Sequence, residues 1–95
     1  MVLTVLEAHV SLDRADDLQA AYIAAREKLP PGLIRSNLLR DTADPQLWRI
    51  QSLWESREAL DAMRSAGTPG GVLMFRSAGA EPTLTVFSVI ATLEI

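Results

Sequence analysis

The chain has 95 residues, of which 48% are hydrophobic, and we expect residues 1–95 to form one domain that buries about two thirds of the unfolded surface. Twelve acidic residues against nine basic ones give a net charge of −3, and the basic residues are scattered singly, which argues against a nucleic-acid partner. Cysteine is absent, so disulfides, thiolate metal sites and cysteine nucleophiles are excluded, and the cytoplasm is the expected location.

The N-terminal residues predict a strand. Val2 to Val10 is rich in aliphatic and β-branched residues and is interrupted by Glu7 and His9. It lacks the basic start and the small-residue cleavage site of a signal peptide. We therefore expect a strand here, and no membrane partner.

A helix is predicted from Ala15 to Leu29. The preceding "SLDRADD" offers Ser and Asp as cap candidates, and Pro30-Pro31 prevents the helix from continuing. Apolar residues recur every three or four positions and form one stripe. The stripe consists of Ala15, Leu18, Tyr22, Ala25 and Leu29.

A β-hairpin is predicted next. The run "LIRSNLLR" (residues 33–40) alternates so that Ile34, Ser36 and Leu38 share one face, and "DTADPQ" carries turn residues. In the second strand, "LWRIQSLW", a period of two places Trp48 and Trp54 on the same face.

The C-terminal part predicts two helical segments and a strand. Ser56 is a good N-cap for a helix with Ala59, Leu60 and Met63 as its buried stripe and Gly67 as its stop. Pro69 at the first helical position predicts a short helix over "GGVLMFRS", ended by Gly79. The run "TLTVFSVIATLEI" (residues 83–95) has almost no breaker and predicts a long final strand.

This order predicts the ferredoxin-like βαββαβ arrangement, an α+β fold with a four-stranded antiparallel sheet of strand order 4-1-3-2. The residues expected to face the helices are Leu6, Ala8, Val10, Ile34, Leu38, Trp48, Ile50, Trp54, Phe87, Val89 and Ala91. The opposite face mixes Leu3, Val5, Leu33, Leu39, Leu53, Val86 and Ile90 with Glu7, His9, Arg35, Asn37, Arg49 and Gln51. A monomer seldom exposes such an apolar patch, so we expect a homodimer formed through this face.

Several stretches resemble the antibiotic biosynthesis monooxygenase domain, a family of the dimeric α/β-barrel superfamily. They are the hairpin "RDTADPQLWRIQSLWES", its Trp54-Glu55-Ser56 step into a helix, and "MFRSAGAEPTLTVF". The resemblance implies that two ferredoxin-like subunits pack their sheets face to face, with a ligand pocket between the sheet and the helices of each. Members oxidise polycyclic phenols without metal or flavin, degrade haem, or process small signalling molecules, and fold analogy alone does not choose among these activities.

Residue by residue, the resemblance carries over only at Trp54. The phenol-oxidising members use an Asn and a Tyr where this chain has Ile50 and Leu60. The haem-degrading members use an Asn and a Trp where the nearest counterparts here are Ala8 and Ala62. We therefore reject haem degradation and expect no cofactor.

The residues expected around a ligand pocket are Trp54, Tyr22, Ser36, Ser52, Met63, Met74 and Phe75. Aromatic rings and adaptable thioethers suit an aromatic ligand, and the two serines could orient a hydroxyl or carbonyl group. The alternative is structural, because two tryptophans can serve only to anchor the sheet to the helices.

His9 is the one weak candidate for a catalytic base, because Glu7 on the same strand face would stabilise its protonated form. An interface role for this histidine is the alternative. Arg35 and Arg49 could fix an anionic ligand or pair with carboxylates. One histidine among scattered carboxylates offers no metal-ligand spacing, so no metal is expected.

Two functions remain open from the sequence. The first is a cofactor-independent monooxygenase that binds an apolar or aromatic small molecule between the sheet and the helices. The second is a non-catalytic dimeric ligand-binding or interaction module of the same fold.

Overall fold

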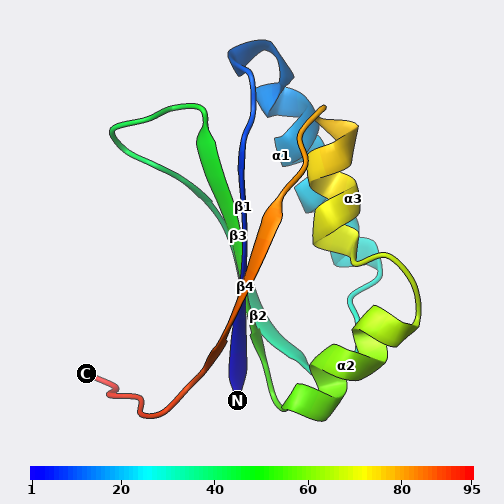
Figure 1. Ribbon diagram of the computed structural model, residues 1–95, viewed down its shortest axis with the longest axis vertical. Helices are drawn as coiled ribbons and strands as arrows, with labels where there is room; N and C mark the ends of the chain where they lie inside the picture. The colour runs from blue at the N-terminus through cyan, green and yellow to red at the C-terminus, as the bar shows by residue number, and fades with distance from the viewer.

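A four-stranded antiparallel sheet carries all helices on one side in the computed structural model, which describes residues 1–95 (Figure 1). Strand order β2-β3-β1-β4 is the predicted order read from the opposite edge, so the ferredoxin-like prediction is confirmed. The elements are β1 (Val2–His9), η1 (Leu12–Arg14), α1 (Ala15–Ala24), η2 (Ala25–Glu27), β2 (Leu33–Arg40), β3 (Leu47–Trp54), α2 (Arg57–Ser65), α3 (Gly70–Ser77) and β4 (Thr83–Ser88).

The two central strands follow the predicted alternation. Every second residue is buried in both, and these residues face the helices: Val2, Thr4, Leu6 and Ala8 on β1, and Trp48, Ile50, Ser52 and Trp54 on β3. Phe75, Leu18 and Leu60 are the largest fully buried side chains and pack the helices onto this face. Both tryptophans therefore belong to the core.

The two tryptophans differ in how their indole N–H groups are satisfied. Trp54 Nε1 donates to Thr4 Oγ1 at 3.1 Å. Trp48 Nε1 is buried without a partner, while the Arg40 guanidinium lies 5.1 Å from the Trp48 ring centroid. An unpaired buried donor costs stability, and only Trp54 has its indole N–H satisfied.

A β-bulge at the start of β2 changes the face of the sheet on which Leu33 and Ile34 lie. Leu33 pairs with Trp54 and Arg35 pairs with Leu53, which leaves Ile34 as the extra residue. Leu33 consequently packs against the Trp54 cluster, whereas Ile34 is 52% exposed. The prediction that Ile34 faces the helices and Leu33 faces away was wrong, because a bulge shifts the alternation by one residue.

The last strand is shorter than predicted, and its faces are reversed. It ends at Ser88, and its register places Val86 opposite Thr4 and Phe87 opposite Leu3. Phe87 therefore lies on the open face, 49% exposed, and Val86 packs towards the helices. Each run of alternate residues carries apolar side chains, Leu84 and Val86 in one and Phe87 and Val89 in the other, so alternation alone leaves the core face undecided.

The helices depart from the predictions mainly at their ends. Ser56 caps α2 as predicted, with its Oγ accepting from the Ala59 N–H at 3.1 Å. Ser11 makes no side-chain cap, and the chain enters α1 through the turn η1 instead. The first helix ends at Ala24 and continues as η2 to Glu27, short of the predicted Leu29.

The third helix lies close to β1. A Cβ atom built on Gly71 would be 2.6 Å from Leu6 Cδ1, so the missing side chain allows this approach. Pro69 is the N-cap residue of α3. The prediction that it is the first helical residue was wrong by one position. Gly79 follows the helix with φ of 76°, which supports its predicted role as the stop.

Candidate functional site

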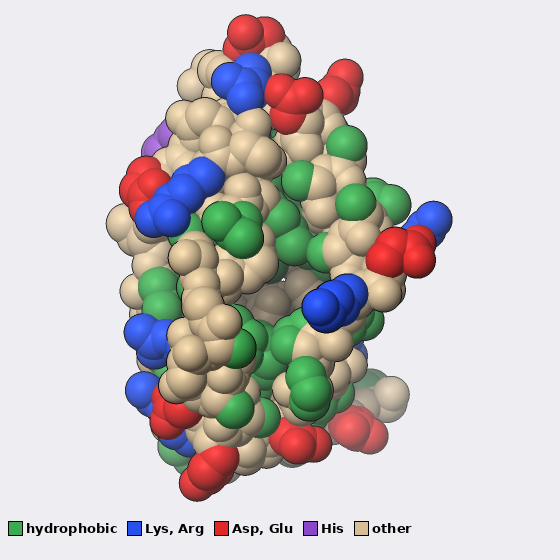
Figure 2. All heavy atoms as spheres, turned by 90° about the vertical axis from the view of Figure 1, so that its right-hand side faces the viewer, with side chains coloured by type: hydrophobic (Ala, Val, Ile, Leu, Met, Phe, Trp, Pro, Cys, Tyr) green, Lys and Arg blue, Asp and Glu red, His purple; other side chains and the backbone are tan.

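A cavity of about 380 Å³ lies between the sheet and the helices. Its walls come from all four strands, from α1, η2, α2 and α3, and from the connection that follows η2. On the helix side of the molecule, hydrophobic side chains gather around a hollow (Figure 2). This volume lies within the range of small-molecule sites, roughly 300–1,000 Å³.

The cavity contains six of the seven residues predicted for the pocket. Trp54, Tyr22, Ser36, Ser52, Met63 and Met74 line it. Phe75 does not line it, because its side chain is fully buried in the core against β1 and β3. The helical stripe of α3 turns Met74 towards the cavity and Phe75 into the packed interior.

The polar part of the lining is a chain of hydroxyl groups. Tyr22 on α1 donates to Ser36 Oγ on β2 at 2.9 Å, and Ser36 Oγ lies 3.1 Å from Ser52 Oγ on β3. The two serines are direct cross-strand neighbours. Since a hydroxyl both donates and accepts, this chain can orient a phenol or carbonyl group of a bound molecule.

The Thr4 hydroxyl holds the indole of Trp54 through a hydrogen bond. The indole N–H is used in the bond to Thr4 Oγ1, and that hydroxyl lies 3.5 Å from the Ser52 carbonyl oxygen, to which it donates. The ring is 4% exposed. Its contribution to the cavity is therefore an apolar wall, not a free donor. Thr4 was not among the predicted pocket residues, although it is the one hydroxyl residue of β1 and stands in an otherwise aliphatic run.

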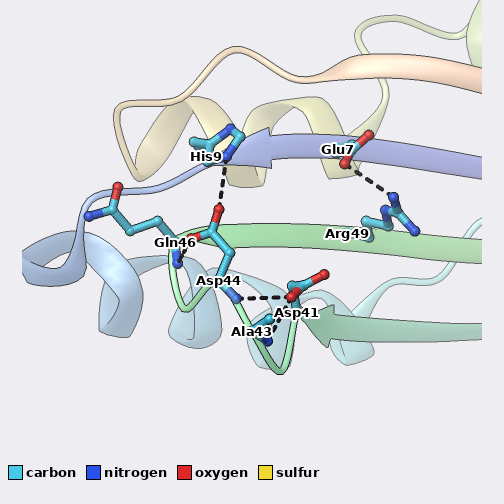
Figure 3. Close-up of polar contacts among 7 residues, drawn as sticks. All are labelled: Glu7, His9, Asp41, Ala43, Asp44, Gln46 and Arg49. Atoms are coloured by element: carbon cyan, nitrogen blue, oxygen red, sulfur yellow. Dashed lines mark hydrogen bonds and ion pairs between the residues drawn. The ribbon is translucent and has the colours of Figure 1, made fainter.

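His9 lies outside this cavity. Its side chain is 67% exposed at the end of β1, and Nε2 lies 3.2 Å from Asp44 Oδ2 in the β2–β3 loop (Figure 3). Glu7, the predicted partner of His9, instead accepts from Arg49 at 3.2 Å. Glu7 pairs with Arg49 and not with His9, because the register places Glu7 directly opposite Arg49.

The loop that carries Asp44 is held by Asp41. Asp41 Oδ1 accepts from the Ala43 N–H at 2.7 Å and from the Asp44 N–H at 2.9 Å (Figure 3). These bonds to Ala43 and Asp44 lower the pKa of Asp41 below its ordinary value. The His9–Asp44 contact is thus built on a rigid turn, at a distance from the cavity.

Residues predicted for the dimer face divide into two groups. Glu7, Arg49 and Gln51 line a shallow depression on the open face together with Leu3, Val5, Thr85 and Phe87. Asn37 pairs with Gln51 on the same face, and His9 lies at its end. Arg35 pairs with Leu53 of the open face and also lines the cavity.

The structure contains no group of three or more His, Cys, Asp or Glu side chains placed to hold a metal ion. None of its helices combines the length and apolar character that a membrane crossing requires.

Comparison with known proteins supports the same fold. A family model described as antibiotic biosynthesis monooxygenase matches residues 1–68, whereas no curated protein matches the chain in sequence. Among solved structures, a protein from Deinococcus radiodurans assigned to the same monooxygenases is similar, with a TM-score of 0.77 at 17% identity, over 100% of this chain and 98% of that one.

Two further structures are similar. SnoaB, a cofactor-independent oxygenase from Streptomyces nogalater, has a TM-score of 0.72 at 19% identity, over 97% of this chain and 95% of that one. A mutant of MhuD with two manganese protoporphyrin IX molecules per active site has a TM-score of 0.74 at 20% identity, over 99% of both chains. At these identities the likeness is one of fold.

Proposed function

The chain belongs to the antibiotic biosynthesis monooxygenase family, and from this premise we propose that it binds an aromatic small molecule beside Trp54 and oxidises it without a cofactor. One observation carries the proposal: the cavity joins apolar walls to a hydroxyl chain within a single site. An apolar cavity with a few converging polar groups is the usual form of a small-molecule site.

The hydroxyl chain favours a substrate that carries a phenol or a ring carbonyl. Ser36 and Ser52 come from rigid neighbouring strands and Tyr22 from the helix above them, so their relative positions are fixed before a ligand arrives. A preorganised site loses less entropy on binding. The thioethers of Met63 and Met74 supply adaptable contacts for the ring faces.

Oxygenation of an anthrone-type phenol would convert a ring methylene group to a carbonyl. The methylene loses a proton, the carbanion gives one electron to O₂, and the two radicals combine as a peroxide that releases water. One O₂ is consumed and one water is formed for each carbonyl. The residues would contribute by orienting the phenol, and the apolar walls by excluding bulk water from the carbanion.

A second candidate function is ligand binding without catalysis. No carboxylate or imidazole side chain lines the cavity, so no strong general base lies within reach of a bound molecule. Ile50 and Leu60, which occupy the positions of the polar residues in phenol-oxidising relatives, both line the cavity. This lining favours a ligand-binding module.

Oxygen uptake with a dihydroxyanthrone separates the two functions. The oxygenase proposal predicts uptake above the spontaneous rate, with one carbonyl formed per O₂, and a lower rate in Tyr22→Phe. Binding by calorimetry with uptake at the spontaneous rate would favour the second function. If the chain shows no binding and no uptake above the spontaneous rate, both functions are contradicted.

We also propose that the protein acts as a homodimer formed through the open face of the sheet, in the cytoplasm. Phe87 is 49% exposed on this face beside Leu3 and Val5. The C-terminal residues leave the sheet on the side away from the helices (Figure 1), with Ile90 90% and Leu93 92% exposed. Packing against a second copy would remove this apolar surface from water.

A further inference from the structure

The charged residues around the cavity are all basic. Arg26, Lys28, Arg35 and Arg64 line it, and no Asp or Glu does. This asymmetry runs against the composition of the chain, which has twelve acidic residues and nine basic ones. Because opposite charges favour each other's approach, such a rim attracts anions and disfavours cations.

Most basic residues elsewhere are already paired. Arg14, Arg49, Arg57 and Arg76 each lie within 3.2 Å of a carboxylate, and Arg40 stacks on the Trp48 ring. These contacts satisfy their charges inside the chain.

The basic residues of the cavity lack such partners. Arg26 has only a loose contact, 3.7 Å from Glu27, in which both side chains are largely exposed. Lys28, Arg35 and Arg64 form no ion pair. The cations that the fold leaves unpaired are therefore the ones gathered around the cavity.

Three different parts of the chain supply these cations. Lys28 follows η2, Arg35 lies beside the β2 bulge, and Arg64 stands in the last turn of α2. Arg35 is paired with Leu53 in the ladder and lines the cavity from the edge of the sheet. We call Lys28, Arg35 and Arg64 the basic rim.

We propose that the basic rim selects aromatic carboxylic acids, whose ring system enters the apolar cavity while the carboxylate stays among Lys28, Arg35 and Arg64. This inference rests on the proposed binding of an aromatic molecule and adds its charge class. Guanidinium groups match a carboxylate in two-pronged geometry, which suits Arg35 and Arg64. A neutral aromatic of the same shape would gain only the apolar contacts.

The expected preference for an acid over its neutral analogue is modest, because the side chains of the basic rim are exposed to solvent. Exposed ion pairs are individually weak, so three cations together would give an acid about tenfold tighter binding than its neutral analogue. Salt screens exposed charges strongly. The preference should therefore shrink to about twofold in ~0.5 M NaCl.

The test compares anthraquinone carboxylate with anthraquinone carboxamide by isothermal titration calorimetry on the full chain. We expect the acid to bind about tenfold tighter at low salt. The double variant Arg35→Gln/Arg64→Gln should lose most of this preference while still binding the amide. Arg57→Gln is the matched control, because Arg57 lies on α2 but pairs with Asp61 and does not line the cavity. Thermal unfolding verifies that each variant folds.

The outcomes separate this inference from the function on which it rests. Equal binding of acid and amide would overturn the charge selection and leave aromatic binding intact. A preference that persists in the double variant would overturn the assignment to Arg35 and Arg64. Failure of both compounds to bind the wild-type chain would overturn the proposed binding function, and the inference with it.

Discussion

The bond from Trp54 Nε1 to Thr4 Oγ1 predicts a measurable coupling between these two residues. Both are more than nine-tenths buried, and 3.1 Å separates the atoms. Thr4→Val keeps the side-chain volume but leaves a buried indole N–H unpaired, which should cost about 1–3 kcal/mol. Trp54→Phe removes the donor and part of the ring, and should cost about 1–3 kcal/mol.

The double variant Thr4→Val/Trp54→Phe should cost less than the sum of the single variants. With both partners of this bond gone, no unpaired indole N–H remains, so we expect a shortfall of about 1 kcal/mol. Urea unfolding of the four proteins measures it through the free energy of unfolding.

Trp48→Phe provides the control for this cycle. Trp48 Nε1 has no partner, and Trp48 lies opposite Ala8 while Thr4 lies opposite Ser52. Combined with Thr4→Val it should be additive within about 0.5 kcal/mol. Equal additivity for both tryptophans would refute the claim that Thr4 holds Trp54 in place.

Three other predictions concern binding, assembly and pH. Trp54→Ala should abolish aromatic binding measured by calorimetry and cost about 3–5 kcal/mol, whereas Trp54→Phe should weaken binding only several-fold; equal affinity in wild type and Trp54→Phe would leave the ring as core alone. Phe87→Asp should shift the chain from dimer to monomer in light scattering, with Thr83→Asp on the same strand as a milder control; a wild-type monomer would contradict the proposed interface. Because backbone bonds lower the pKa of Asp41, its stabilisation should be present above its ordinary value of 3.8 and be lost as pH falls through the folded value. Asp41→Asn should therefore lower the melting temperature at neutral pH but not in strong acid, and a difference that persists in acid would be inconsistent with this cause.

The fold was predictable because its central strands are unambiguous. Trp48, Ile50 and Trp54 share one face and the opposite face carries Arg49 and Gln51, so period two assigns the buried face of β3 correctly. Ser56 stands at a helix start where its side chain can cap the first turn, and it does so.

The edges of the sheet were harder to predict. On β4, Val86 and Phe87 are both suited to a core, and only pairing with β1 decides between them. On β2, a bulge shifts Leu33 and Ile34, and no residue in that run signals it. Tertiary register, not local preference, sets these faces.

The candidate site was predictable where it coincides with the core face. Ser36 and Ser52 follow from alternation, and their cross-strand contact follows from the hairpin register. The basic rim was not predictable in the same way. Lys28, Arg35 and Arg64 line one cavity only through tertiary packing, and each alone resembles an ordinary surface residue.

The most direct test of aromatic binding beside Trp54 uses the two indole N–H signals in a nitrogen-edited NMR spectrum, assigned with Trp48→Phe. Trp54 lines the cavity and Trp48 does not, so titration with anthraquinone carboxylate should shift the Trp54 signal and leave the Trp48 signal in place. Movement of the Trp48 signal alone, or of neither at saturating ligand, would contradict the account.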